Sequence, residues 1–120
     1  MAVKSRTIQS GKIAIIELKG SLIGDQDTDT LRETVADFVE QGNKCLIIDL
    51  ERVHYMNSSG IGSLIAAHAS YARNKGQIRL VGISKSVQNL FVITKLIDVF
   101  EVDDTLDDAI QSFVRTKSTT

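Results

Sequence analysis

Apolar and polar positions recur along the chain with two periods, one typical of strands and one typical of helices. Two β-rich runs open the chain, and Ser10-Gly11 between them is a link that closes a hairpin when glycine takes a positive φ. The later run KCLIIDL is short and continuously apolar, which predicts a strand covered on both faces. The expected strands are residues 3–9, 12–19, 44–50, 77–83 and 98–102.

Four amphipathic segments predict helices. In the first, Thr30 and Glu33 form a capping box, and Gly42 is a stop signal. Gly76 is expected to supply a left-handed stop after the second helix, and the last helix opens with an acidic turn, as the helix dipole favours. The expected helices are residues 27–43, 59–74, 86–96 and 105–114.

The alternation of strands and helices predicts an α/β domain with one mixed sheet, an opening antiparallel hairpin and about four helices packed against the sheet. A chain of 120 residues with 42% hydrophobic residues can bury one core but not two. Residues 1–120 are therefore expected to be a single domain, with a core over residues 3–115 and a polar tail at 116–120.

Charge and cysteine content narrow the classes of partner. The 14 basic and 15 acidic residues leave a net charge of -1, which argues against nucleic acid. No apolar run approaches the roughly 20 residues of a membrane helix, so we expect a cytoplasmic protein without membrane insertion. Cys45, the one cysteine, lies in an apolar run, which predicts a buried thiol.

The serines and histidines do not have the spacing of a known catalytic motif. Neither Ser58 nor Ser59 stands in a Gly-x-Ser-x-Gly nucleophile elbow. His54 and His68 are the only imidazoles, and we interpret both as structural or solvated, with His68 at the boundary of the core. No catalytic residue is assigned, and the chain is expected to be a non-enzyme.

An acidic cluster, Asp25, Asp27 and Asp29, imitates the start of a calcium loop. The sixth and twelfth positions, which need Gly and Glu, are Thr30 and Ala36. We therefore expect the cluster to serve the loop and the helix start, and we expect no metal and no cofactor.

The stretch YMNSSGIGSL at residues 55–64 places two serines between an apolar strand and an apolar helix. A helix start needs one side-chain cap, so one of the two hydroxyls is not explained by capping. Two interpretations fit: Ser58 or Ser59 caps the helix and the glycines permit a tight turn, or a serine carries a phosphate that the helix N-terminus tolerates, with Gly60 and Gly62 keeping the approach open. Pattern alone does not decide between them.

The segment KCLIIDLERVHYMNSSGIGSLIAAH resembles the central signature of STAS domains, the family of bacterial anti-sigma factor antagonists. In that signature an apolar strand ending in Asp leads into Asp-Ser-Ser-Gly-Leu/Ile-Gly. The resemblance is closest from Cys45 to Leu64 and extends more loosely over the chain. It implies that the whole chain is one STAS domain.

The resemblance also implies a function. In phosphorylatable members the second serine, here Ser59, accepts phosphate from a partner that is both anti-sigma factor and serine kinase. The unphosphorylated protein binds this kinase and frees a sigma factor, phosphate blocks the complex, and a PP2C-type phosphatase removes the phosphate. A second implied function is a STAS subunit that is never phosphorylated and assembles into a signalling scaffold or a transport complex.

The signature assigns roles to the neighbours of Ser59, and the chain departs from it in two places. Asn57 stands where the family has an acidic residue, and Ile23 replaces an Asp of the first loop, so we expect altered kinase specificity. Asp49 and Asp25 are expected to organise the supporting loops. The residues expected to contact the partner are Asn57, Ser58, Gly60, Ile61 and Gly62.

Overall fold

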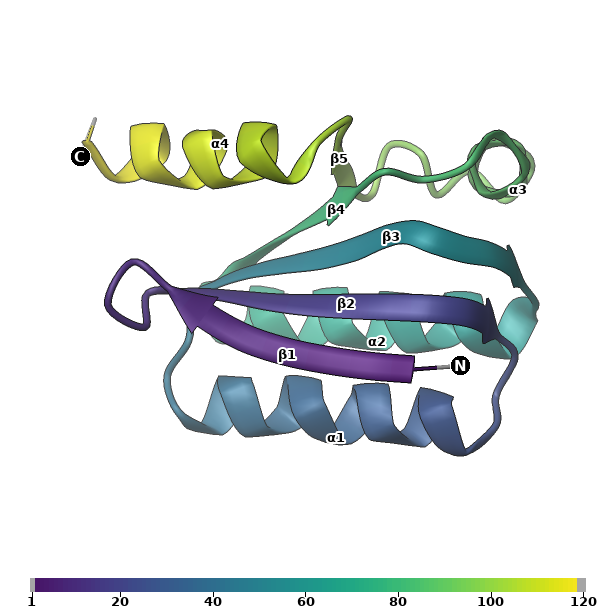
Figure 1. Cartoon of the computed structure of the whole chain (residues 1–120), viewed down its shortest axis with the longest axis horizontal. Coiled ribbons are helices and arrows are strands. Elements are labelled where there is room, and N and C mark those ends of the chain that lie inside the picture. Colours follow the sequence, from purple (N-terminus) through teal and green to yellow (C-terminus); the bar gives the residue numbers. More distant parts are fainter. Residues whose placement is uncertain (1, 119–120) are drawn as a thin grey trace.

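Strands and helices alternate through residues 2–118, the part of the chain that the computed structural model describes, with side chains from Val3 to Arg115. The elements are β1 (Ala2–Ile8), β2 (Ile13–Leu22), α1 (Gln26–Glu40), β3 (Cys45–Met56), α2 (Ser58–Arg73), β4 (Gln77–Val81), α3 (Lys85–Ile93), β5 (Glu101–Asp103) and α4 (Leu106–Ser118). The strands form one sheet in the order β1-β2-β3-β4-β5, antiparallel between β1 and β2 and parallel elsewhere (Figure 1). The predicted mixed α/β fold is confirmed.

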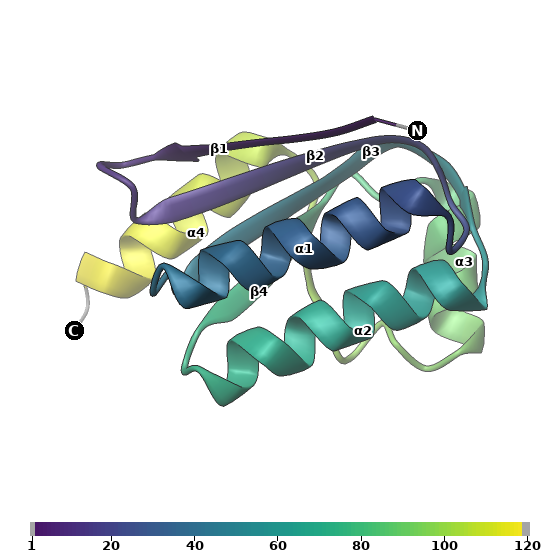
Figure 2. The same ribbon diagram turned by 90° about the horizontal axis from the view of Figure 1, so that it is seen from below.

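Helices cover both faces of the sheet. α1 and α2 lie side by side on one face, and α4 lies on the other (Figure 1, Figure 2). Because successive strand residues point to opposite faces, Ile48 joins the core under α1 and α2 while Ile47 joins the smaller core under α4. Both are fully buried. Burial of such a side chain contributes about 1.5–3 kcal/mol, which explains the continuous apolar run of this strand.

β3 is longer than the sequence pattern predicts, because it runs for 12 residues, to Met56. β4 pairs only with Cys45 to Asp49, and the remainder of β3 pairs with β2 alone. Register shifts between Glu17 and Lys19 and between Gly20 and Ser21 interrupt the pairing with β2. Such irregularities break the alternation of buried and exposed residues. The sequence of the second half of β3 therefore lacks the two-residue hydrophobic period that predicts a strand.

The β1–β2 hairpin has a longer connection than the predicted two-residue link. Ile8 pairs with Ile13, so residues 9–12 form the loop. Gln9, Ser10 and Gly11 all have positive φ, at 54°, 57° and 83°. Glycine does take a left-handed conformation there, but two non-glycine residues share it.

α1 begins earlier than predicted, and its cap is a different residue. Asp25 has extended backbone geometry, and its side chain accepts hydrogen bonds from the backbone N–H groups of Asp27 and Thr28. The expected capping box is therefore wrong. Thr30 lies inside the helix, where its hydroxyl donates to the carbonyl oxygen of Gln26 at 3.0 Å.

The two predicted glycine stops have different outcomes. Gly42 has φ +85° just after α1, which confirms a left-handed stop. After α2 the left-handed residue is Lys75, at φ 62°, and the prediction for Gly76 is wrong. A Cβ on Gly76 would lie 2.8 Å from the ring of Tyr71, so this position is glycine because of close packing.

The C-terminal elements have different bounds from those expected. α3 ends at Ile93, and β5 begins only at Glu101. α4 continues to Ser118, so the first three residues of the expected polar tail are helical, and residues 119–120 lie outside the described part.

The expected environments of two side chains are confirmed. Cys45 is buried. His68 is half-buried, and its ring centroid lies 5.5 Å from that of Phe100 in an edge-on contact at the margin of the core.

Candidate functional site

The turn from β3 into α2 is held by Asn57. Its backbone is extended, and its side-chain oxygen accepts a hydrogen bond from the backbone N–H of Gly60 at 3.0 Å, as a helix cap does. Its side-chain nitrogen donates to the carbonyl oxygen of Ile23 at 3.0 Å. One amide therefore caps α2 and ties it to the loop between β2 and α1.

Neither serine caps the helix, so the interpretation of Ser58 or Ser59 as the cap is wrong. The physical reason is that an Asn side chain one position earlier reaches the same N–H group. Ser58 and Ser59 are the first two residues of α2, and both are exposed. Within residues 2–118, neither hydroxyl makes a hydrogen bond to another residue. The prediction that Ser59 lies within one turn of the helix start is confirmed.

Gly24 brings the β2–α1 loop against Ser59. Its φ is +86°, and a Cβ placed on it would lie 2.7 Å from the Cβ of Ser59 and 3.0 Å from its hydroxyl oxygen. Glycine is required here by both backbone conformation and space. The loop is fixed further because the Gly24 N–H donates to the hydroxyl of Thr28 at 2.9 Å.

Acidic residues follow the loop that Gly24 holds against the candidate phosphoacceptor. Asp25 follows Gly24 and caps α1, as a loop-organising role predicts. Asp27 and Asp29 stand in the first turn of α1, whereas α2 has no acidic residue in its first turn. The N-terminus of α2 thus offers its partial positive charge to Ser59, with carboxylates on the neighbouring helix start.

Gly60 serves internal packing, contrary to the expectation that it keeps the surface open. A Cβ on Gly60 would lie 2.1 Å from the carbonyl oxygen of Leu22, so the first turn of α2 rests directly on β2. Ile61 is only 8% exposed. A Cβ on Gly62 would meet nothing within 4 Å. Of the five residues expected to contact a partner, Ser58 is the exposed one, Asn57 and Gly62 are half-buried, and Gly60 and Ile61 are buried.

Asp49 lies in the first half of β3, far from the turn that follows the end of this strand. It is not at the end of β3 but inside it, and its carboxylate accepts a hydrogen bond from the backbone N–H of Glu51 at 3.0 Å. Asn57 lies eight positions further along the chain, an extended path of roughly 25 Å. The prediction that Asp49 stands at the end of its strand is wrong, because β3 continues to Met56.

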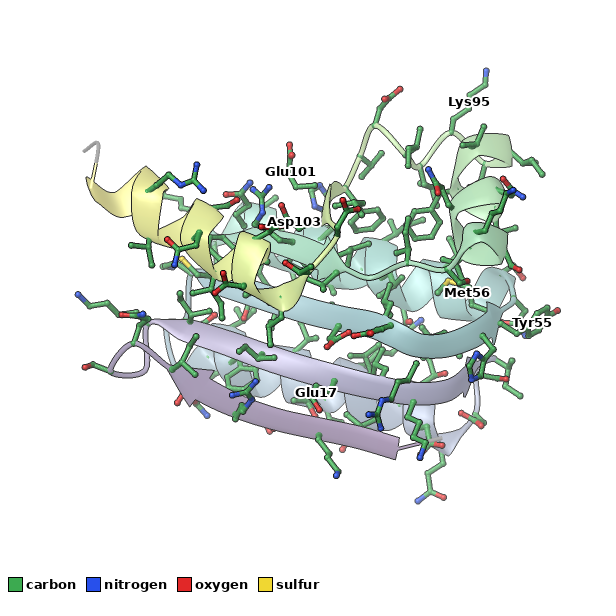
Figure 3. The ribbon with its side chains drawn as sticks, turned by 45° about the horizontal axis from the view of Figure 1, so that its top comes forward. Glu17, Tyr55, Met56, Lys95, Glu101 and Asp103 are labelled. Carbon is green, nitrogen blue, oxygen red and sulfur yellow. The ribbon has the colours of Figure 1, made fainter. Side chains whose placement is uncertain are left out.

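An apolar groove of about 480 Å³ opens beside the serines. It lies between the end of β3, the start of α2 and α3. Figure 3 labels Tyr55 and Met56 at this end of β3. The lining residues are His54, Tyr55, Met56, Asn57, Ser58, Ile61, Ser86, Val87, Leu90 and Thr94. The sequence pattern did not predict this groove, although the aromatic Tyr55, three residues before Ser58, was a signal for it.

The described residues form neither a metal cluster nor a membrane-spanning helix. Between residues 2 and 118, no three His, Cys, Asp or Glu side chains gather in a way that could hold a metal ion. No helix in that part of the chain has the length and apolar character needed to cross a membrane.

Comparisons with known proteins agree with this architecture. An anti-sigma-B factor antagonist of Staphylococcus aureus (strain NCTC 8325 / PS 47) is 28% identical over 74 residues, which are 62% of this chain and 68% of that protein. The Bacillus cell fate determinant SpoIIAA, solved in its phosphorylated form, matches with a TM-score of 0.75 at 21% identity, over 93% of this chain and 99% of that chain. A sulfate transporter family protein from Wolinella succinogenes matches with a TM-score of 0.78 at 20% identity, over 91% and 89% of the two chains.

At these identities the solved structures show a common fold, while the sequence match shows relatedness to anti-sigma factor antagonists. The family model described as "STAS domain" matches residues 4–109, which include every strand after the first residues of β1, the Asn57 turn and the groove. The chain therefore belongs to the STAS domain family.

Proposed function

We propose that this protein is a phosphorylation-switched binding module that acts on an anti-sigma factor with serine kinase activity. The observation that carries the proposal is the exposed Ser59 hydroxyl, which makes no hydrogen bond to a described residue because Asn57 caps α2 instead. A hydroxyl that the fold does not use is available to a second protein. In its unphosphorylated form the module binds the kinase and releases a sigma factor.

The switch is a transfer from ATP that the kinase holds. The Ser59 oxygen attacks the γ-phosphorus, the bond from that phosphorus to ADP breaks, and the hydroxyl proton passes to a base of the kinase. The phosphate gains about -1.5 to -2 charge at the N-terminus of α2, where the helix stabilises an anion by roughly 0.3–1 kcal/mol. The fold should therefore tolerate the modification.

Binding should not tolerate it. The product phosphate would stand against the phosphates of the bound nucleotide, and its burial in the interface without a cation costs several kcal/mol. A loss of about 2.8 kcal/mol weakens a complex roughly a hundredfold. A PP2C-type phosphatase would restore the binding form. Because ATP and sigma factors act in the cytoplasm, the protein would work there as a binding module, not as an enzyme.

A second candidate is a STAS subunit that assembles into a signalling or transport complex without phosphorylation. The contact of Gly24 with Ser59 favours it, since the loop stands against one side of the hydroxyl. The absence of a carboxylate at Asn57 points the same way, because the family signature has an acidic residue there.

The deciding experiment is intact-mass analysis after incubation with ATP and an anti-sigma serine kinase from the same organism. Wild type should gain one phosphate, Ser58→Ala should gain one, and Ser59→Ala should gain none. Ser58→Ala is the matched control because both serines are exposed in the first turn of α2. A chain that binds the kinase stably but never gains phosphate would favour the second candidate.

A further inference from the structure

The groove beside Ser58 has a buried apolar floor and exposed apolar rims. Met56 and Val87 on the floor are each 2% exposed. Tyr55 on one wall is 58% exposed. Ile93, three residues after Leu90 on the opposite wall and hence on the same side of α3, is 77% exposed. Large apolar side chains exposed around a concave apolar surface mark an interaction site.

The groove is built for an uncharged group. None of its ten lining residues is Asp, Glu, Lys or Arg, and the ionisable side chains among them are those of His54 and Tyr55. Its volume of about 480 Å³ falls in the range of sites that enclose a ligand-sized group. The occupant that such a lining stabilises is an aliphatic or aromatic side chain.

Charged residues next to the groove indicate which residues the partner carries around the side chain that it places in the groove. Ser58 lines the groove, while the adjacent Ser59 contacts Gly24 in the loop that leads into α1. That loop leads into Asp25, the cap of α1, and Asp29 in the first turn of α1, and both residues are exposed. A partner that covers both serines therefore meets an apolar groove on one side and carboxylates on the other, and a basic surface complements the carboxylates.

We infer that the groove is the anchor site for an apolar side chain of the kinase that acts on Ser59, carried on a segment whose basic residues face the first turn of α1. This inference rests on the proposed function and adds the contact that gives the complex its affinity. A side chain that fills a desolvated pocket near the centre of an interface is the usual source of binding energy. The phosphoacceptor lies directly beside the anchor, so the anchored partner is positioned for transfer.

The test measures the dissociation constant of the unphosphorylated full chain with the kinase by titration calorimetry. Tyr55→Ser removes one apolar wall, and Ser86→Trp fills the groove from an exposed position on α3. Each should weaken binding at least about tenfold. Val114→Ser is the matched control, because Val114 is 38% exposed on α4, on the other side of the sheet, and this change should leave the dissociation constant within about twofold. Thermal unfolding confirms that each variant is folded.

Two variants that each remove one negative charge test whether the kinase segment carries basic residues. Asp29→Asn in the first turn of α1 should slow association several-fold at low salt, and the difference should shrink at high salt. Asp107→Asn in the first turn of α4 loses the same helix-dipole contribution and should not slow association.

The outcomes separate the inference from the proposed function. Folded Tyr55→Ser and Ser86→Trp proteins that bind the kinase as wild type does, and that are still phosphorylated at Ser59, would overturn the anchor site alone. Wild type that neither binds the kinase nor gains phosphate would overturn the proposed function and the anchor with it. Dimers in sedimentation that Tyr55→Ser abolishes, or a small apolar molecule retained in native mass spectra and lost in Ser86→Trp, would assign the groove to another occupant.

Discussion

The side-chain nitrogen of Asn57 donates to the carbonyl oxygen of Ile23 at 3.0 Å, which joins two loops that are 34 residues apart in the chain. The same amide accepts from Gly60 N–H, and the backbone N–H of Asn57 donates to the carbonyl oxygen of Leu22 at 3.2 Å. These bonds hold the first turn of α2 and the β2–α1 loop as one unit. Ser59, in the first turn of α2, lies against Gly24 of that loop.

Substitutions of Asn57 should separate its two roles. Asn57→Ala loses the cap, at about 1 kcal/mol, and the bond to Ile23, at about another 1 kcal/mol. Asn57→Asp keeps the cap acceptor and loses only the donor, so its free energy of unfolding should fall by roughly half as much. Urea unfolding of the three proteins measures the difference. Equal losses in both variants would show that the cap contributes nothing, and an Asn57→Asp protein as stable as wild type would show the same of the bond to Ile23.

Two neighbouring glycines should respond oppositely to alanine. Gly60→Ala places a Cβ 2.1 Å from the Leu22 carbonyl oxygen, and relief of that overlap should cost about 1–3 kcal/mol or more. Gly62→Ala meets no atom within 4 Å, and alanine is favoured in a helix, so it should stabilise by up to about 1 kcal/mol. Denaturant midpoints of both variants test this. A Gly60→Ala protein as stable as wild type would contradict the close contact of α2 with β2.

Ser59 should control binding with little effect on folding. Ser59→Ala should bind the kinase and resist the switch, while Ser59→Asp should bind poorly and melt within a few degrees of wild type, because a carboxylate at a helix N-terminus is stabilising. Titration calorimetry and thermal unfolding provide the two measurements. Since Asp imitates phosphate imperfectly, the titration is repeated with phosphorylated protein, and tight binding of that form would exclude repulsion at the interface.

Tyr71 should make the fold sensitive to alkaline pH. Its hydroxyl donates to the side-chain oxygen of Asn43 at 2.8 Å, and burial, with a smaller effect of Cys45, raises the pKa of Tyr71 far above its ordinary value. The native state therefore keeps a proton that the unfolded chain loses near pH 10. This contribution is complete below about pH 10 and declines as pH rises beyond it toward the folded-state pKa.

The measurement is the free energy of unfolding in urea at pH values from about 8 to 11. Wild type should lose stability across the upper part of this range. Tyr71→Phe should be less stable at pH 8, because Asn43 loses its partner, but should show a smaller alkaline decline. Parallel declines in the two proteins would show that another group is responsible.

Local pattern was sufficient to predict which segments become helices and strands and where Ser59 lies. The spacing of apolar residues indicates which face of an element is buried. The NSSG turn could be predicted because it depends only on the residues that directly link the strand to the helix. The buried strand before it and the placement of Ser59 within the first helical turn were predicted on this basis and are confirmed.

Tertiary structure decided the features that depend on partners distant in the chain. β3 extends to Met56 because β2 pairs with it through two register shifts, and Gly60 is glycine because Leu22 occupies the space a Cβ would need. The groove exists because Leu90 of α3 and Thr94, the C-cap of that helix, are brought near Tyr55 at the end of β3. Period and composition describe a residue and its near neighbours in sequence, whereas these contacts form only when separate elements pack together.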